Sequence, residues 1–232
     1  MACFGGCCIK PAIHAAIIDL DGTMVDTLGD FAAALNGMLV DLGLPAIAPS
    51  AIEPMVGKGS ENLIHSVLKH VLALIPSAQA AIHNEALFDR AFARYQHHYG
   101  AINGQFSQLY PGVVAGLQAM QQRGWKLACV TNKPIALALP LLQAKGLGGF
   151  FSQVFGGDSF DRKKPDPLPL LKTCEALGTL PAHTLVVGDS SNDAQAARAA
   201  GCPVLLVTYG YNHGEPVRMV DCDGFLDALV DI

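Results

Sequence analysis

Four short runs of apolar residues constrain the fold of this 232-residue chain more than any other feature of its sequence. Each run is continuous rather than alternating, which is typical of strands buried on both faces of a parallel sheet. The four runs are Ala15–Ile18, 127–130, 185–187 and Val204–Val207, and a weaker fifth candidate is Gln153–Phe155. The sequence therefore predicts a parallel sheet with these runs as its strands.

Helical patterns separate the later strands. They span 113–123, 134–145, Leu168–Leu177 and 192–200, and each is followed by a glycine, the residue that most often ends a helix. Alternation of strands and helices is typical of α/β folds. We therefore expect a doubly wound, Rossmann-like core in which helices cover both faces of the sheet.

One long interval between the first two strands interrupts this alternation. Amphipathic helical patterns fill it, and prolines lie in the loops between them. The helical segments are 27–43, 60–75 and 79–99. A crossover between parallel strands needs only a dozen or so residues, whereas about eighty lie here. We expect an all-helical cap at 27–105, inserted into an α/β catalytic core formed by 1–26 and 106–232.

Composition limits the class of protein. The formal net charge is −5 and no basic run is present, so we expect no attraction to nucleic acid. No apolar stretch reaches the roughly 20 residues that cross a bilayer. The residues before the first strand lack the basic start of a signal peptide. We therefore expect a cytoplasmic protein that binds neither nucleic acid nor a membrane.

Three of the seven cysteines cluster near the N-terminus, at Cys3, Cys7 and Cys8. No second pair of cysteines or histidines follows them at the spacing of a zinc site. We interpret them as reduced thiols, with metal binding or lipid attachment as the alternatives. They do not predict a function.

Polar residues follow the predicted strands directly. They are Asp19 and Asp21 after the first strand, Thr131 and Asn132 after the second, and Asp189 after 185–187, with Lys163 and Lys164 in the loop "DRKKPDP". In open parallel sheets, ligands bind outside the carboxyl ends of the strands. We therefore expect these side chains to face one common crevice.

The residue types in this crevice point to phosphoryl transfer. Several carboxylates suit Mg²⁺, and without a cation they would repel one another. A lysine, a threonine hydroxyl, an amide and a helix N-terminus suit a phosphate group. Asp19 and Asp21 alternate on an extended segment, so their side chains point in opposite directions unless the backbone turns, and Gly22 permits that turn. Asp19 can then act as a carboxylate nucleophile while Asp21 acts on the leaving group.

The motifs "DLDGT", "TN", "KP" and "GDSSND" occur in this order between residues 17 and 193. Together they resemble the haloacid dehalogenase-like phosphatases, and the position of the helical segment resembles that of members with a helical cap. The strings "TNKP", "GGDSFDRKKPDP" and "YPGV" are more particularly similar to bacterial phosphoglycolate phosphatases.

The resemblance implies roles for four acids. Asp19 attacks phosphorus and ligates Mg²⁺. Asp21 protonates the leaving alkoxide and then activates the hydrolytic water, while its backbone carbonyl ligates the metal. Asp189 completes the metal site, and Asp193 supports that site or adds a further ligand.

The resemblance also implies a phosphate site formed by Thr131, Asn132 and Lys164. The neighbouring Lys163 is a rival for the role of Lys164. Lys58, in the cap loop "VGKG", is a candidate for contacting a substrate carboxylate. The alternative is that this loop is an ordinary solvated start of a helix.

The expected reaction is Mg²⁺-dependent hydrolysis of a small phosphate monoester, namely 2-phosphoglycolate to glycolate and phosphate through an aspartyl-phosphate on Asp19. A sugar phosphate, pyrophosphate or a phosphomutase reaction is an alternative, because the cap selects the leaving group. A phospho-receiver signalling domain is the non-enzymatic alternative, but the helical module argues against it. We expect a monomer or homodimer. Asp26 either matches an acid common in the family or caps the next helix.

Overall fold

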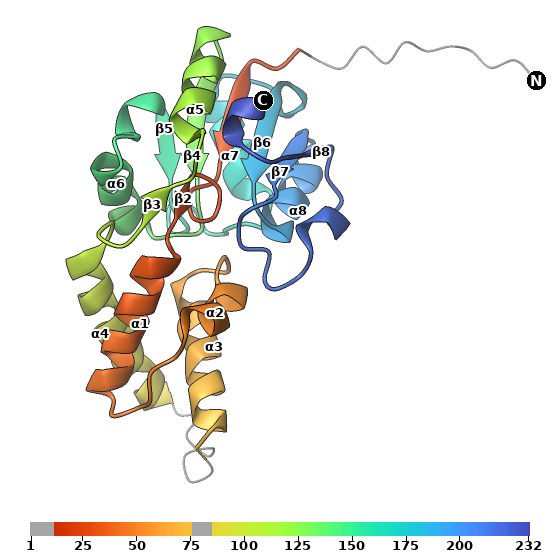
Figure 1. Ribbon diagram of the computed structural model, residues 1–232. Coiled ribbons are helices and arrows are strands. Elements are labelled where there is room, and N and C mark those ends of the chain that lie inside the picture. Colours follow the sequence, from red (N-terminus) through yellow and green to blue (C-terminus); the bar gives the residue numbers. More distant parts are fainter. Residues whose placement is uncertain (1–11, 76–84) are drawn as a thin grey trace, which may run out of the picture.

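The computed structural model describes residues 12–75 and 85–232 (Figure 1). Cys3, Cys7 and Cys8, and the first part of the helix expected at 79–99, lie outside these ranges. A sheet flanked by helices forms one part of the molecule, and a group of helices packs below it in the view of Figure 1.

The sheet has six parallel strands in the order β5-β4-β1-β6-β7-β8. Their bounds are β1 (Ala15–Ile18), β4 (Lys126–Val130), β5 (Gln153–Phe155), β6 (Thr184–Gly188), β7 (Val204–Val207) and β8 (Gly224–Leu226). β1 lies at the centre, between β4 and β6, and all four of its residues are buried. The five predicted strands are confirmed, and β8 was not predicted.

Helices cover both faces of this sheet. They are α5 (Val113–Gln122), α6 (Ile135–Ala144), α7 (Leu168–Leu177) and α8 (Ser191–Ala200). Ala16 and Ile18 of β1 belong to a core that includes residues of α5 and α6, whereas Ala15 and Ile17 belong to a second core with α7 and α8. Successive residues of a strand point to opposite faces, so one four-residue strand joins both cores. The predicted doubly wound α/β class is confirmed.

Within the described ranges, four further α-helices lie between β1 and β4 in the chain, and we call them the cap helices. They are α1 (Leu28–Asp41), α2 (Pro49–Ile52), α3 (Ser60–Ala73) and α4 (Glu85–Ile102). They have a hydrophobic core of their own, in which α4 packs against both α1 and α3. Tyr211, from the loop after β7, is the buried residue of the α/β part that joins this core.

A two-stranded antiparallel ribbon connects the two parts. β2 (Val25–Asp26) pairs with β3 (Gln108–Leu109), so the chain leaves for the cap helices and returns from them at neighbouring points. The borders predicted at 26/27 and 105/106 lie next to this ribbon. The division into two domains stays a prediction.

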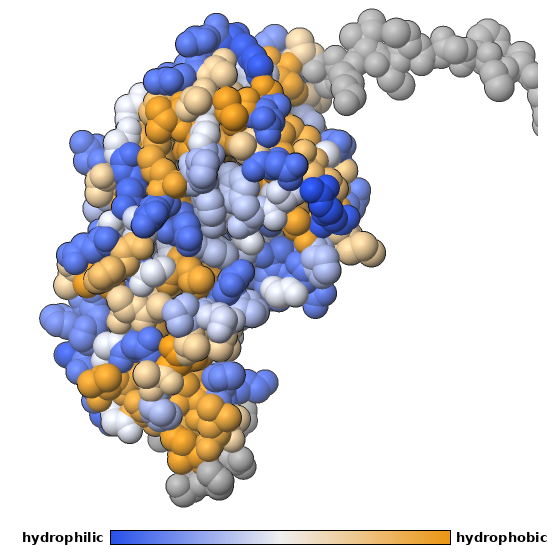
Figure 2. Space-filling model, viewed as in Figure 1, coloured by the Kyte–Doolittle hydropathy of each residue, from blue (hydrophilic) through white to orange (hydrophobic). Residues whose placement is uncertain are grey.

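Short 3-10 helices occupy several loops. They are η1 (Glu53–Met55), η3 (Gly148–Phe150), η4 (Pro181–His183), η5 (Val217–Met219) and η6 (Leu229–Asp231). Within the described ranges, no helix combines the length and apolarity needed to span a membrane. Exposed apolar side chains include Val40, in the last turn of α1, and Leu74, directly after α3. Figure 2 shows apolar surface among the cap helices at the end of the molecule far from the sheet.

Candidate active site

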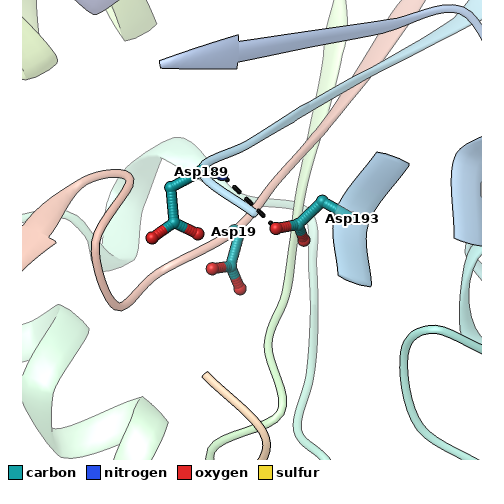
Figure 3. Close-up of side chains that lie close together, drawn as sticks. All are labelled: Asp19, Asp189 and Asp193. Carbon is teal, nitrogen blue, oxygen red and sulfur yellow. Dashed lines mark hydrogen bonds between the residues drawn. The ribbon is translucent and has the colours of Figure 1, made fainter. Parts of the chain in front are cut away.

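Three carboxylates meet at the carboxyl ends of the central strands. Asp19 directly follows β1, Asp189 directly follows β6, and Asp193 lies in the first turn of α8 (Figure 3). Each offers one oxygen atom, and these oxygens all lie within 4.8 Å of one another. The sequence prediction that acids from separate strand ends come together is thus borne out for Asp19 and Asp189.

Lys164 places its ammonium group among these acids. Its Nζ lies 2.7 Å from Asp19 Oδ1 and 2.6 Å from Asp193 Oδ1, and it also donates to the carbonyl oxygen of Val130 at 2.8 Å. Lys163 lies elsewhere, since its Nζ is close to Gly59 in the loop before α3. Of the two adjacent lysines, the structure brings Lys164 to Asp19.

Asp193 organises the turn that carries Asp189. Its Oδ2 accepts hydrogen bonds from the backbone N–H groups of Asp189 and Ser190, at 3.3 and 3.2 Å, and from the Ser190 hydroxyl at 2.9 Å. Because Oδ1 is paired with Lys164, both carboxylate oxygens have donors. Asp193 is therefore suited to holding Lys164 and the turn in place.

Burial raises the pKa of two of these acids. The pKa of Asp19 is raised to about 7 by burial, with the charge of Lys164 opposing the shift and those of Asp193 and Asp21 adding to it. Burial and the charges of Asp193 and Asp19 raise the pKa of Asp189 well above its usual value. Burial acts to lower the pKa of Lys164, but Asp19 and Asp193 outweigh it, and the pKa is raised. The positive charge beside these buried acids is thus too small to stabilise all of them in the ionised form.

This shortage can be counted among the described residues that line the central cavity. Four of them are acids, namely Asp19, Asp21, Asp189 and Asp193, and two are bases, namely Lys133 and Lys164. When all six side chains are ionised, their net charge is −2, which one divalent cation would neutralise. Carboxylate oxygens are the ligands that Mg²⁺ prefers. The donor set therefore fits a divalent cation held by Asp19 and Asp189.

Gly22 allows the chain to pass Asp189. Its φ is +84°, and a Cβ atom at this position would lie 2.0 Å from Asp189 Oδ2. The Gly22 N–H donates to the carbonyl oxygen of Val25 at 2.9 Å, which closes the turn expected after Asp21. Only a residue without a side chain satisfies both the backbone conformation and the close contact.

The central cavity lies between the strand ends and the cap helices. Its volume is about 40 Å³, and its cap-side lining includes Phe31 of α1, Tyr95 of α4, and the loop residues Val56 and Gly57. Ligand pockets usually have volumes above roughly 300 Å³. The cap helices and the strand ends thus enclose a small space in this structure.

Three side chains of the α/β part hold the cap loop over this cavity. Asn132 Nδ2 and Asn192 Nδ2 both donate to the carbonyl oxygen of Gly57, at 3.2 and 3.1 Å. His213 Nδ1 lies 2.8 Å from the carbonyl oxygen of Val56, so this nitrogen carries the proton that is donated. The loop and the strand ends are therefore linked directly.

The two residues predicted after β4 both line the cavity. Thr131 Oγ1 accepts a hydrogen bond from the backbone N–H of Lys133 at 3.1 Å, which leaves its own hydroxyl proton available. Asn132 Nδ2 donates to the carbonyl oxygens of Gly57 and Lys164. The role of Thr131 and Asn132 in binding phosphate stays a prediction. The Asn132 amide also links the cap loop to the loop that carries Lys164.

Two further predicted residues lie away from the cavity lining. Lys58 is exposed, and the described lining of the cavity does not include it. Its role as a substrate contact stays a prediction without support from this arrangement. Asp26 Oδ1 accepts from the Leu28 N–H at 3.1 Å and from the Tyr211 hydroxyl. These contacts favour the interpretation of Asp26 as a residue that orders the start of α1.

Lys133 is a site residue that the sequence reasoning did not assign. Its Nζ lies 3.0 Å from Asp21 Oδ1 and 2.5 Å from the hydroxyl of Tyr99, and its side chain is 3% exposed. Its position directly after Thr131 and Asn132 was the available signal. Asn192 was also unassigned, and His213 was expected only to border the crevice, because the partners of both residues belong to the cap loop, far away in sequence.

Comparison with known proteins agrees with this geometry. The sequence model of the haloacid dehalogenase-like hydrolases matches residues 16–207, and the chain belongs to this family. The phosphoglycolate phosphatase of Thiobacillus denitrificans is 43% identical over 94% of this chain and 93% of its own length. That of Nitrosospira multiformis is 44% identical over the same shares.

A solved structure extends the likeness to the fold. The crystal structure of a predicted phosphoglycolate phosphatase from Haemophilus somnus superposes with a TM-score of 0.89 at 34% sequence identity. The alignment covers 94% of this chain and 96% of that one, so both the sheet and the cap helices are included.

Proposed function

We propose that this protein is a Mg²⁺-dependent phosphatase that hydrolyses 2-phosphoglycolate to glycolate and phosphate. The observation that carries the proposal is the pairing of Asp19 with Lys164 beside Asp189, in a buried cavity also lined by Asp21. Relatives named phosphoglycolate phosphatase that are 43–44% identical over nearly the whole chain support the choice of substrate.

In the first step, a carboxylate oxygen of Asp19 forms a bond to phosphorus, and the bond from phosphorus to the glycolate oxygen breaks. Asp21 gives its proton to that leaving oxygen. Lys164 donates to Asp19 Oδ1 at 2.7 Å and thereby orients the nucleophile. A carboxylate nucleophile divides the overall hydrolysis into two easier steps.

In the second step, Asp21 takes a proton from a water molecule, whose oxygen attacks phosphorus. The bond between phosphorus and Asp19 breaks, and phosphate leaves. The hydroxyl of Thr131 has a free proton with which to hold the phosphoryl oxygens, because its oxygen already accepts from the Lys133 N–H. Lys164, which is paired with Asp19, neutralises charge on the phosphoryl group.

The residues that would hold the magnesium ion are Asp19 and Asp189, together with the backbone carbonyl of Asp21. They fit the ion because the buried set lacks two positive charges, and because one oxygen each of Asp19 and Asp189 lie within 4.8 Å of each other. When bound, Mg²⁺ would stabilise the charge that develops on the transferred group. Asp193 holds Lys164 and the turn before α8.

The size of the cavity favours a small substrate. With the cap loop held by Asn132 and Asn192, about 40 Å³ remains between the cap helices and the strand ends. A two-carbon leaving group such as glycolate demands less further space than a sugar. The cytoplasmic location and the monomeric or dimeric state expected from the sequence stay predictions.

The test is release of inorganic phosphate from a panel of phosphate esters by the purified protein. We expect the highest kcat/KM for 2-phosphoglycolate, loss of turnover in EDTA and recovery on adding Mg²⁺. A sugar phosphate or pyrophosphate with a higher kcat/KM would replace the proposed substrate. Isomerisation of a sugar phosphate without phosphate release would indicate a phosphomutase, and a long-lived phosphoprotein without turnover would contradict the proposal of an enzyme.

A further inference from the structure

The cavity contains a second buried ammonium group, that of Lys133, and its partner differs from that of Lys164. Lys164 pairs with the nucleophile Asp19, whereas Lys133 pairs with Asp21, which handles the leaving group in the proposed reaction. Lysine is among the residues least often buried, because removing an ammonium group from water is costly. One carboxylate at 3.0 Å offsets only part of that cost.

The surroundings of Lys133 hold its ammonium group in place. The side chain extends from the end of β4 between two cap helices, and its Nζ lies 5.0 Å from the ring centre of Phe31 on α1 and 4.5 Å from that of Tyr99 on α4. The Tyr99 hydroxyl accepts one hydrogen bond from Nζ at 2.5 Å. Burial raises the pKa of Tyr99 well above its usual value, so this hydroxyl stays neutral. The aromatic rings and the hydroxyl thus fix the position of a cation.

One donor of this cation remains for a ligand. An ammonium group has three N–H donors, and the structure assigns one to Asp21 and one to Tyr99. Lys133 lines the cavity, so its remaining donor has access to a bound molecule. Among the described lining residues, only Lys133 and Lys164 are basic, and Lys164 already donates to three oxygens.

The geometry of the reaction places a substituent of the leaving group beside this donor. Asp21 must contact the leaving oxygen in order to protonate it, and Lys133 Nζ is 3.0 Å from Asp21 Oδ1. In 2-phosphoglycolate, the carboxylate is attached to the carbon that carries this oxygen. A carboxylate there therefore lies within reach of Lys133 when the ester oxygen lies at Asp21.

We propose that Lys133 is a specificity-determining residue, whose buried ammonium group binds the carboxylate of an ester that is phosphorylated at the adjacent carbon. The proposal rests on the proposed function and names the residue that selects its substrate class. It assigns to Lys133 the task that the sequence suggested for Lys58, which is exposed and outside the described cavity lining.

The test compares 2-phosphoglycolate with ethyl phosphate, in which a methyl group replaces the carboxylate. For Lys133→Met, we expect kcat/KM for 2-phosphoglycolate to fall roughly 10- to 100-fold more than kcat/KM for ethyl phosphate, the range for a hydrogen bond to a charged group. Any effect that acts through Asp21 lowers both values alike and cancels in the ratio. Lys133→Arg, which keeps the charge, should retain more of the preference than Lys133→Met.

Three further arms make the test decisive. Melting temperatures with Mg²⁺ establish that each variant is folded, and Lys133→Gln serves as the second variant if Lys133→Met is not. Lys172→Met, on the exposed face of α7, controls for loss of a lysine charge. Lys58→Met tests the rival residue, and a change of the ratio in this variant alone would overturn the proposal.

The outcomes also separate this proposal from the proposed function. If the wild-type protein hydrolyses 2-phosphoglycolate but Lys133→Met lowers kcat/KM equally for both esters, Lys133 does not read the carboxylate and only the present proposal fails. If the wild-type protein releases no phosphate from 2-phosphoglycolate, both proposals fail. A selective loss for 2-phosphoglycolate in Lys133→Met supports both.

Discussion

The two walls of the cavity, one formed by the strand ends and the other by the cap helices, differ in the chemical character of their side chains. The wall formed by the strand ends presents buried charges, with Asp19, Lys164 and Asp189 held by hydrogen bonds. The wall formed by the cap helices presents Phe31 and Tyr95, together with the backbone of the loop around Gly57. Charged groups carry the chemistry of phosphoryl transfer, whereas apolar groups shape the space around the leaving group. We therefore expect the charged wall to govern the rate, and the space left by the cap wall, together with Lys133 of the loop after β4, to govern the choice of substrate.

The largest effect should come from the nucleophile in the charged wall. We expect Asp19→Asn to lower kcat for phosphate release at least about 10⁴-fold, the scale seen when the attacking group of a covalent mechanism is removed. Circular dichroism and gel filtration should show an intact fold. Asp166→Asn, in an exposed ion pair with Arg162, is the matched control and should keep its turnover. Substantial turnover by Asp19→Asn would refute the covalent mechanism.

A smaller loss should follow from a side chain at Gly22. The Cβ of Gly22→Ala would lie 2.0 Å from Asp189 Oδ2, so Asp189 must move, and we expect kcat/KM to fall roughly 100-fold. Gly43→Ala is the control, because Gly43 also has a positive φ but no atom lies within 4 Å of its Cβ position. Equal losses of activity in the two variants would show that backbone strain, and not the displaced carboxylate, is responsible.

Mg²⁺ should stabilise the folded protein through the same wall. At a Mg²⁺ concentration 100-fold above Kd, binding adds about 2.7 kcal/mol to the free energy of unfolding. For a chain of this size, that corresponds to a rise in Tm of roughly 5–10 °C. Scanning calorimetry of the wild-type protein and of Asp189→Asn tests this, since the variant should show little or no rise. A full rise in the variant would exclude Asp189 as a ligand.

The smallest effect should arise in the cap wall. Asn192→Ala removes one of the two hydrogen bonds to the Gly57 carbonyl, which weakens the closed arrangement by about 1 kcal/mol. We expect KM to rise several-fold while kcat changes little. Asn36→Ala removes hydrogen bonds to the backbone of Ile47 within the cap part, and should lower Tm without raising KM. A large fall of kcat in Asn192→Ala would contradict this prediction and show that Asn192 contributes to the chemical step.

The sequence predicts the charged wall better than the cap wall, for a physical reason. Asp19 and Asp189 directly follow continuous apolar runs, and the ends of parallel strands meet at one sheet edge. Local sequence therefore determines where these acids lie. β8 escaped prediction because its three residues contain a glycine and follow "DCD", without an apolar run.

The choice between adjacent lysines and the role of Lys133 depend on distant contacts. In the sequence, Lys164 is distinguished from Lys163 only by the proline that follows it, and the folded loop then directs the two side chains to different places. Lys133 has partners 112 and 34 residues away in the chain, at Asp21 and Tyr99. No local pattern marks such a pairing, because it exists only after the cap helices have packed against the strand ends.

The small volume of this cavity also bears on how a substrate reaches the strand ends. A cavity of about 40 Å³ has room for a few water molecules, since each needs about 10–15 Å³ measured in this way. It has no room for 2-phosphoglycolate, so the space between the cap helices and the strand ends must widen before such a substrate is bound. The hydrogen bonds from Asn132 and Asn192 to the carbonyl oxygen of Gly57 link the two sides of the cavity, so they are among the contacts that this widening breaks. Entry of the substrate and release of the products therefore both require the loop around Gly57 to move.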